Sequence, residues 1–307
     1  MKAFVVSCLC CILHIMTRKL IVTHHAPDLD AIGASWLLKS FDTQHYGDAK
    51  FAFVNPGQTI DSSEISKLQI SSEDVVHVDT GLGKFDHHQP ERGHDHSSAS
   101  SLVHDYLCHL HPELSNDHAL GLLVDFITEI DHFGEIYWPE ANHFRYNFML
   151  HQIIRGLEFV ELHNDDSQLH FGFTCLDGVY AALIQHVRAR EILETKAQYF
   201  PIKLGECMAV ETRNDDTLKL AQQYGSIIAI RKDTAQGHIR IKARPDAEID
   251  LKALADEISL VDSEGTWYYH PGGKMLINGS KKHHNQNPSP LSLEQVIELI
   301  KKIYGNK

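Results

Sequence analysis

The chain has 307 residues, with 41 acidic and 28 basic side chains, so its formal net charge is −13 when the 23 histidines are counted as neutral. Its contents of hydrophobic residues (43%) and charged residues (22%) are typical of globular proteins, which excludes disorder as the main description. The negative charge argues against general binding of duplex nucleic acid, because such binding needs Lys and Arg side chains to neutralise phosphates. A small phosphorylated substrate is not excluded, because a bound metal ion can supply positive charge locally.

Residues 1–15 form a mostly apolar stretch that is too short to span a bilayer and has the length of a signal-peptide core. No cleavage site of small residues follows, and Met16 stands just before a strand-like run. We interpret residues 1–15 as a loose extension or a non-native start, with a targeting role as the alternative. The six cysteines form no Cys-x-x-Cys pair, which fits a reducing compartment. We expect a cytoplasmic protein without a membrane partner.

The front half of the chain alternates strand-like and helical segments. Strands are expected over residues 20–23, 51–54 and 75–78, and helices over residues 31–41, 98–109 and 116–130. This alternation predicts an α/β fold in which a parallel sheet carries helices on both faces. Such sheets place their binding sites in the loops at the carboxyl ends of the strands.

The back half starts with two helical patterns, over residues 140–160 and 178–199, the second ending before Pro201. After them we expect strands over residues 207–211, 226–230 and 238–243, and helices over residues 217–224 and 251–258. A capping box at Ser292 predicts the start of a last helix. The sequence therefore predicts two α/β domains, over residues 16–177 and 201–307, joined by a connector helix over residues 178–200.

Four segments carry aspartates and histidines, and three of them follow strands, where a parallel sheet would form its binding site; the fourth, at Asp131, follows a helix. The first follows the first strand and contains an Asp-x-Asp pair, whose like charges are unfavourable unless a cation lies between them. Each segment alone is consistent with a helix cap, a turn or a surface position. Their joint occurrence in successive loops favours a metal site, and its candidate residues are His24, Asp28, Asp30, Asp79, Asp86, His87, His88 and Asp131.

These residues resemble the motifs of the DHH phosphoesterase superfamily, which includes RecJ-type exonucleases, oligoribonucleases, exopolyphosphatases and family II pyrophosphatases. Residues 27–33 (PDLDAIG) are similar to the first motif, Asp79 matches the second, residues 86–88 (DHH) match the third, and Asp131 matches the fourth, with Asp125 as the reserve candidate. The resemblance covers residues 19–132. Further on, residues 239–245 (IRIKARP) resemble the smaller substrate-binding domain of the family, and residues 270–274 (HPGGK) are a shorter equivalent of its glycine-rich turn.

The resemblance implies that residues 16–177 form a catalytic domain with two divalent cations. One ion would be bound by His24, Asp28 and Asp79, and the other by Asp30, the shared Asp79, His87 and Asp131. Four carboxylates and two imidazoles are a hard ligand set, which favours Mn²⁺, with Mg²⁺ as the alternative, over a thiolate-type zinc site. His88 would donate to phosphoryl oxygens or carry a proton, and Asp86 would hold an imidazole in its ligating tautomer.

We therefore expect a metal-dependent phosphoesterase that hydrolyses a small phosphorylated substrate, such as a short single-stranded oligonucleotide or a nucleotide phosphate. In the domain over residues 201–307, the residues expected to bind that substrate are Arg240, Arg244, Gly272, Gly273 and Lys274. Two alternatives stay open: an inorganic pyrophosphatase or exopolyphosphatase, and a catalytically silent metal- or nucleotide-binding regulator. The complete ligand set argues against the regulator, and a homodimer is left open.

Overall fold

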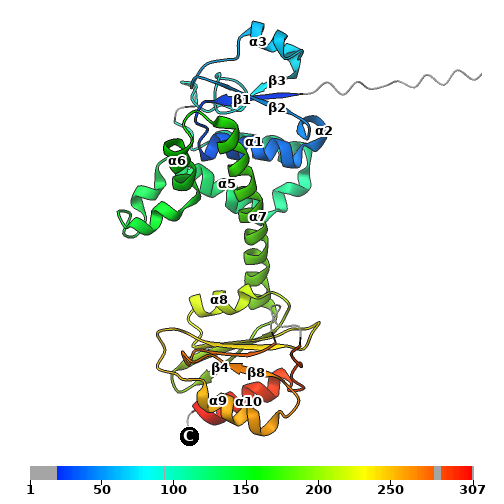
Figure 1. Ribbon diagram of the computed structural model, residues 1–307, viewed down its shortest axis with the longest axis vertical. Helices are drawn as coiled ribbons and strands as arrows, with labels where there is room; N and C mark the ends of the chain where they lie inside the picture. The colour runs from blue at the N-terminus through cyan, green and yellow to red at the C-terminus, as the bar shows by residue number, and fades with distance from the viewer. Residues whose placement is uncertain (1–18, 93, 280–284, 306–307) are drawn as a thin grey trace, which may run out of the picture. The chain divides into compact units, whose positions relative to one another are not determined.

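The computed structural model describes residues 19–92, 94–279 and 285–305. The interpretation of residues 1–15 lies outside the described residues. The chain divides into two compact units, one ending at Tyr180 and the other starting at Ala181, and each is described by itself (Figure 1).

The first unit contains a three-stranded sheet whose central strand is β1 (Leu20–His24). Strands β2 (Lys50–Val54) and β3 (Val75–His77) flank β1, and both pair with it in parallel. Leu20, Ile21 and Val22 are fully buried, which is why β1 reads as a continuous apolar run. Because the three strands are parallel, their carboxyl ends meet at one edge of the sheet, where the loops after β1 and β3 lie.

Helices cover both faces of this sheet. Figure 1 shows α3 (Ser62–Lys67) on one side of the sheet and α1 (Leu29–Phe41) on the other. Ile65 of α3 packs on the apolar side chains of β1 and β2. On the opposite side, α1 contacts α4 (Ala99–Leu110) and α5 (His118–Asp131). The predicted parallel sheet with helices on both faces is confirmed.

Glycine at position 33 allows this close packing of helices. A Cβ atom at Gly33 would lie 2.6 Å from Cδ1 of Ile127 in α5 and 2.7 Å from Oγ of Ser100 in α4. Both distances are far below van der Waals contact, so a larger side chain would force the helices apart. The beginning of α4 is thereby held against the beginning of α1.

Three short elements of this unit flank the main layers: α2 (Thr43–Tyr46) and the 3₁₀ helices η1 (Ser72–Asp74) and η2 (Pro112–Asn116). After α5 the chain differs from the sequence prediction. Residues 140–160 were expected to be one helix, but the chain forms η3 (Gly134–Tyr137), η4 (Phe144–Phe148) and then α6, which begins only at Leu150 and ends at Val160. The expected connector helix over residues 178–200 is α7 (Asp165–Thr195), which starts earlier and ends earlier.

The chain after α7 forms strand β4 (Gln198–Ile202), although Pro201 had suggested only the end of a helix. β4 is the edge strand of its sheet, so no strand lies on its open side to receive a hydrogen bond there. A proline, which lacks an N–H group, is tolerated in such a strand. Edge position thus explains how a proline is accommodated in a strand.

The second unit is built on a six-stranded sheet with the order β4-β5-β6-β7-β9-β8. Only β5 and β6 pair in parallel, and the other neighbours are antiparallel. The strands that follow β4 are β5 (Gly205–Glu211), β6 (Ile228–Lys232), β7 (Ile239–Ala243), β8 (Trp267–Tyr269) and β9 (Met275–Asn278). Figure 1 shows α8 (Asp216–Gln223) on one face of this sheet, with α9 (Lys252–Val261) and α10 (Leu293–Tyr304) on the other.

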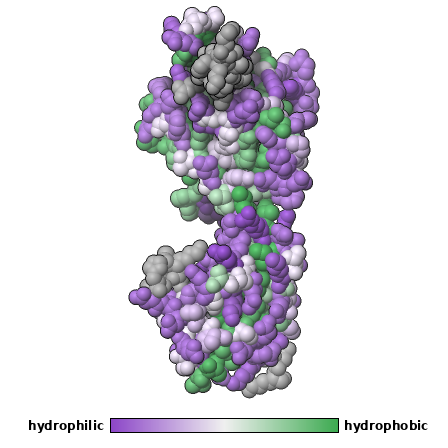
Figure 2. Space-filling view, turned by 90° about the vertical axis from the view of Figure 1, so that its right-hand side faces the viewer, coloured by the Kyte–Doolittle hydropathy of each residue, from purple (hydrophilic) through white to green (hydrophobic). Residues whose placement is uncertain are grey.

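The alternation that predicted β7 is confirmed, since Ile239, Ile241 and Ala243 are buried in the core beneath α9 and α10. The capping box at Ser292 is also present and opens α10. Strands β4, β8 and β9 were not predicted. In Figure 2, hydrophilic residues cover most of the face in view, with hydrophobic residues in smaller patches. No helix within the described ranges is both long and apolar enough to span a membrane.

Candidate metal centre

The sheet edge brings His24 and Asp79 together. His24 is the last residue of β1, and its Nε2 lies 3.3 Å from Oδ2 of Asp79 and 3.9 Å from Oδ1 of Asp28. His24 Nδ1 is 2.8 Å from the carbonyl oxygen of His25 and donates to it, which leaves Nε2 facing the carboxylates. Asp79 has a left-handed backbone with φ of 54°, a conformation that aspartate adopts more readily than most residues.

The two aspartates of the Asp-x-Asp pair are held by helix ends. Asp28 caps α1, and its Oδ1 accepts from the N–H groups of Asp30 and Ala31, each at 3.0 Å. Asp30 is 2% exposed, and its carboxylate accepts from the N–H groups of Ala99 (2.6 Å) and Ser100 (2.8 Å) at the start of α4. The amino end of a helix favours a negative charge. Burial and the charge of Asp79 nevertheless raise the pKa of Asp30 well above its usual range.

The DHH segment contributes two histidines with different surroundings. Asp86 is fully buried and accepts from the N–H of Leu82 at 2.7 Å and from Nδ1 of His88 at 2.8 Å. Asp86 therefore orients His88, whose side chain is 59% exposed. His87 points into the cluster instead, and its Nε2 lies 3.5 Å from Oδ1 of Asp79.

His87 also connects the cluster to the end of α5. Its Nε2 lies 3.5 Å from Oδ2 of Asp131 and 4.0 Å from Oδ2 of Asp30. Asp131 is the last residue of α5, whereas Asp125 is exposed on the same helix and belongs to none of the ligand groups found among the described residues. The structure thus brings Asp131, and not the reserve candidate Asp125, to the cluster.

The arrangement fits hard divalent cations. The described residues contain three groups whose ligand atoms lie within 4.8 Å of one another: His24 with Asp28 and Asp79, Asp30 with His87 and Asp131, and Asp79 with His87 and His88. Three atoms of these groups are buried without a hydrogen-bond partner, namely Asp79 Oδ1, His87 Nε2 and Asp131 Oδ2. Because buried polar atoms almost always have a partner, these atoms are suited to bind an ion. Their oxygen-rich chemistry matches Mn²⁺ or Mg²⁺.

The acidic cluster shifts the titration of its members. Burial lowers the pKa of His24, but its hydrogen bond to Asp79 and the nearby negative charges outweigh burial and raise that pKa to about 9. The carboxylate of Asp79, 3.5 Å from His87 Nε2, also raises the pKa of His87 to about 9. Burial raises the pKa of Asp131 to about 6, against the opposing charge of His87. In the metal-free protein, protonated imidazoles therefore supply the positive charge that the carboxylates require.

The loop between β1 and α1 is fixed by residues that the sequence did not suggest. Asp165, the first residue of α7, accepts from the N–H of Ala26 at 2.8 Å and lies 2.6 Å from Nδ1 of His25. Gln168 donates to the carbonyl oxygen of Pro27 at 2.9 Å. Some 140 residues separate these partners along the chain, so only the fold reveals the contacts.

A cavity of about 450 Å³ adjoins the cluster within the first unit. Besides Asp28, Asp30, His87, His88 and Asp131, it is lined by one face of α6 and by the segment after α5. Residues 151, 154, 155 and 158 of α6 share this face because they are spaced by three and four positions. The lining residues from these two segments include Phe133, Glu135, His151, Gln152, Ile154, Arg155 and Glu158.

The polar groups of this cavity wall have few partners. Arg155 is exposed and makes no ion pair or side-chain hydrogen bond with another described residue. His151 Nδ1 and Glu135 Oε2 are buried without a hydrogen-bond partner, and burial lowers the pKa of His151. These residues carry no signal in the sequence, because a helical pattern does not indicate which face of the helix meets a distant loop.

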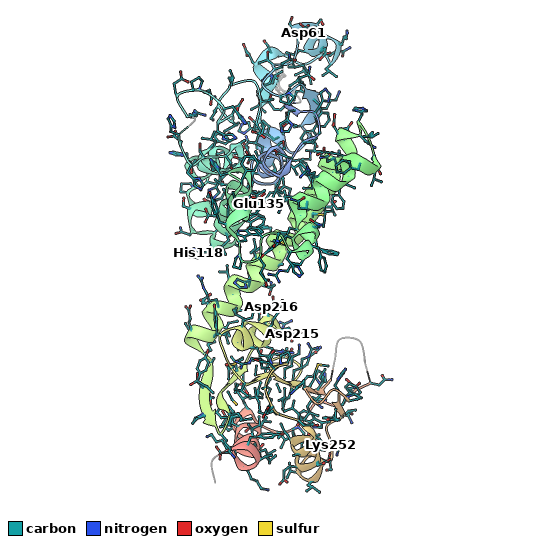
Figure 3. All side chains as sticks on the ribbon, turned by 90° about the vertical axis from the view of Figure 1, so that its left-hand side faces the viewer. Asp61, His118, Glu135, Asp215, Asp216 and Lys252 are labelled. Atoms are coloured by element: carbon teal, nitrogen blue, oxygen red, sulfur yellow. The ribbon has the colours of Figure 1, made fainter. Side chains whose placement is uncertain are left out.

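The cations expected to bind substrate in the second unit have partners within that unit. Arg240 donates to Asp215, labelled in Figure 3 at the start of α8, at 2.6 Å. Arg244 donates to Asp246 at 2.6 Å. Lys274 donates to the carbonyl oxygens of residues 247 and 249, at 2.5 and 2.7 Å. Arg244 and Lys274 thus meet at the loop of residues 244–250, whereas Arg240 lies near the other end of β7.

The glycines at positions 272 and 273 form the turn between β8 and β9. Gly273 has φ of 73°, and a Cβ atom there would approach the carboxylate of Asp250 to about 3.1 Å. The carbonyl oxygen of Gly273 accepts from the N–H of Leu251, which ties the turn to the start of α9. This geometry accounts for glycine at position 273 without a ligand, so its role in substrate binding stays a prediction.

Comparison with known proteins finds no matching family model and no matching curated protein. Among solved structures, the chain is similar to a DHH-domain protein described as a member of a family of ribosomal proteins. The two chains are 14% identical, the match covers 94% of this chain and 88% of that chain, and the TM-score is 0.30. This chain resembles DHH-domain proteins.

Two further solved structures are similar to this chain. One is RecJ from Thermus thermophilus in complex with Mn²⁺, with 12% identity, a TM-score of 0.31, and coverage of 92% of this chain but only 52% of that chain. The other is an exopolyphosphatase-related protein from Bacteroides fragilis, with 14% identity, 93% and 91% coverage, and a TM-score of 0.25.

Proposed function

We propose that this protein is a divalent-metal-dependent phosphoesterase that hydrolyses a small phosphorylated substrate, such as a nucleotide phosphate or a short oligonucleotide, with Mn²⁺ as the preferred ion. The observation that carries the proposal is the position of Asp79, whose two carboxylate oxygens lie 3.3 Å from His24 and 3.5 Å from His87. One carboxylate therefore joins two groups of ligands. A pair of divalent cations supplies Lewis acidity toward phosphoryl oxygens and lowers the pKa of a water.

The side chains divide naturally between two ions. His24 and Asp28 lie on one side of Asp79, and Asp30, His87 and Asp131 lie on the other. The protons on His24 and His87 must leave when an ion binds, since only neutral imidazole is a ligand. Metal affinity should therefore weaken as the pH falls.

His88 is suited to act on the substrate itself. Asp86 accepts a hydrogen bond from His88 Nδ1, so the exposed ring presents Nε2 to the cavity beside the cluster. When the ring is protonated, Nε2 can donate to a phosphoryl oxygen or transfer its proton to the leaving oxygen. This role requires the ring orientation that Asp86 imposes.

Arg155 is our first candidate for binding the substrate phosphate. It is the only Lys or Arg side chain lining the cavity in the described part of the chain, and its planar guanidinium matches phosphate oxygens. Arg240, Arg244 and Lys274 remain the second hypothesis, and each would have to exchange an internal partner for the substrate.

The test is hydrolysis of pyrophosphate, polyphosphate, dinucleotides and 3′-phosphoadenosine 5′-phosphate, side by side, with Mn²⁺ and with Mg²⁺. We expect Mn²⁺-dependent turnover of an organic phosphate that Asp131→Asn abolishes. Asp125→Asn is the matched control, because Asp125 lies on the same helix but is exposed outside the cluster. Preference for pyrophosphate would identify the inorganic alternative, and Mn²⁺ binding without any turnover would identify a silent regulator.

A further inference from the structure

Phe133 has an unusual backbone and an unusual position. Its φ is 56°, in the left-handed region, and its side chain is 70% exposed at the wall of the cavity. A helix often ends with a left-handed residue, but that residue is usually glycine, because a bulky side chain is disfavoured there. Here α5 ends at Asp131 with His132 as its cap, Phe133 after the cap takes the left-handed conformation, and Gly134 follows it. Folding of α5 thus gives no reason for a phenylalanine at position 133.

The exposed ring of Phe133 also has no partner among the described residues. No other aromatic ring or cation stacks on it, although such pairs are frequent elsewhere in this unit. A strained, exposed side chain beside a catalytic cluster is the kind of backbone outlier from which a functional role can be inferred. An aromatic face at the mouth of a cavity is suited to stack a flat ring.

The same cavity carries two carboxylates away from the metal-ligand candidates. Glu135, labelled in Figure 3, and Glu158 belong to η3 and α6, and Glu135 Oε2 is buried without a hydrogen-bond partner. Carboxylates accept hydrogen bonds from N–H groups and repel phosphate oxygens. A chain of inorganic phosphates would place negative charge against Glu135 and Glu158, whereas a ring with amino or imino hydrogens would satisfy them.

We infer that this part of the cavity binds the organic portion of the substrate, a planar ring that stacks on Phe133 and donates N–H groups to Glu135 or Glu158. A nucleobase has this chemistry. The inference rests on the proposed function, because the phosphate of the same molecule must lie at the metal cluster. It selects nucleotides over inorganic polyphosphate as the substrate class.

The experiment compares a ligand with and without the ring. Non-hydrolysable phosphonate analogues of adenosine 5′-monophosphate and of ribose 5-phosphate are titrated calorimetrically into the Mn²⁺-loaded protein. Stacking of one base on an aromatic side chain should make the adenosine analogue bind at least about fivefold more tightly. Phe133→Gly should remove this preference while leaving the binding of the ribose analogue unchanged.

Two controls separate ring binding from structural damage. Phe133→Gly relieves the left-handed strain, so its melting temperature should equal or exceed that of the wild type. Phe148→Ala removes a phenylalanine of similar exposure (75%) that does not line the cavity, and it should keep the base preference.

Equal affinity of the wild type for the two analogues, or an equal loss of both in Phe133→Gly, would overturn the inference and leave the phosphoesterase proposal intact. Failure of the Mn²⁺-loaded protein to bind either analogue would overturn the phosphoesterase proposal together with the inference.

Discussion

Replacing Asp131 by asparagine should stabilise the metal-free protein. In the folded chain, burial raises the pKa of Asp131 from an ordinary 3.8 to about 6, so its ionised form at pH 7 opposes folding. One pKa unit corresponds to about 1.36 kcal/mol, so the difference between the two pKa values corresponds to about 3 kcal/mol. Solvent screens this energy only weakly, because the side chain is 12% exposed. We expect about 1–3 kcal/mol of added stability, because asparagine also gives up the attraction to His87. For a unit of this size the melting temperature should rise by about 3–10 °C.

The pH dependence identifies the cause. A carboxyl group whose pKa is raised by folding destabilises the folded state above that pKa, and the penalty vanishes below its unfolded pKa. The advantage of Asp131→Asn should therefore be full near pH 7, shrink as the pH falls through about 6, and be gone near pH 4. Thermal melts of both proteins in excess chelator from pH 4 to pH 8 measure this. A lower melting temperature at pH 7, or a gain that persists at pH 4, would refute the reasoning.

Three further outcomes are expected. Asp79→Asn keeps a residue that tolerates the left-handed backbone but removes the shared charge. Mn²⁺-dependent turnover should therefore fall at least about 100-fold, while the circular dichroism spectrum stays unchanged. Retained turnover would contradict the proposal that Asp79 is shared between two ions. Mn²⁺ at about 100 times its dissociation constant should add about 2.7 kcal/mol of stability, seen as a rise in melting temperature that chelator reverses; no rise would argue against the metal site. Arg155→Ala should raise KM about tenfold, which corresponds to about 1.4 kcal/mol of lost binding free energy. Arg145→Ala is the control and should leave KM unchanged, because Arg145 is paired with Glu140. An effect in Arg244→Ala alone would instead assign phosphate binding to the second unit.

The sequence was sufficient to locate the sheet edge of the first unit where the candidate metal ligands gather. Strand β1 is a buried, continuous apolar run, and half-buried β3 carries a pair of β-branched valines, so both could be located, and with them the loops that carry Asp28 and Asp79. The aspartates and histidines then stood out against this background, because close like charges need a cation. Strands β8 and β9 are only three and four residues long, so neither shows enough alternation to be recognised.

The cavity wall could not be predicted in the same way. Arg155 and Glu158 belong to an ordinary amphipathic helix, and only the packing of α6 against α1 and η4 decides which of its faces meets the cluster. The hydrogen bonds of Asp165 to the loop after β1 likewise join distant parts of the chain. Phe133 had a local cue, a phenylalanine directly before Gly134 at a helix end, but its left-handed backbone is visible only in the structure.

The left-handed backbone at position 79 also restricts which residues can occur there. Glycine, asparagine and aspartate adopt this conformation more readily than most residues, and β-branched residues are strongly disfavoured. Of the three, aspartate alone supplies a charged ligand. A mutational scan scored by protein abundance should therefore tolerate Asn and Gly at position 79 and reject Val and Ile, while a scan scored by turnover should accept Asp alone. The difference between these two scans would separate the folding requirement from the chemical one at a single residue.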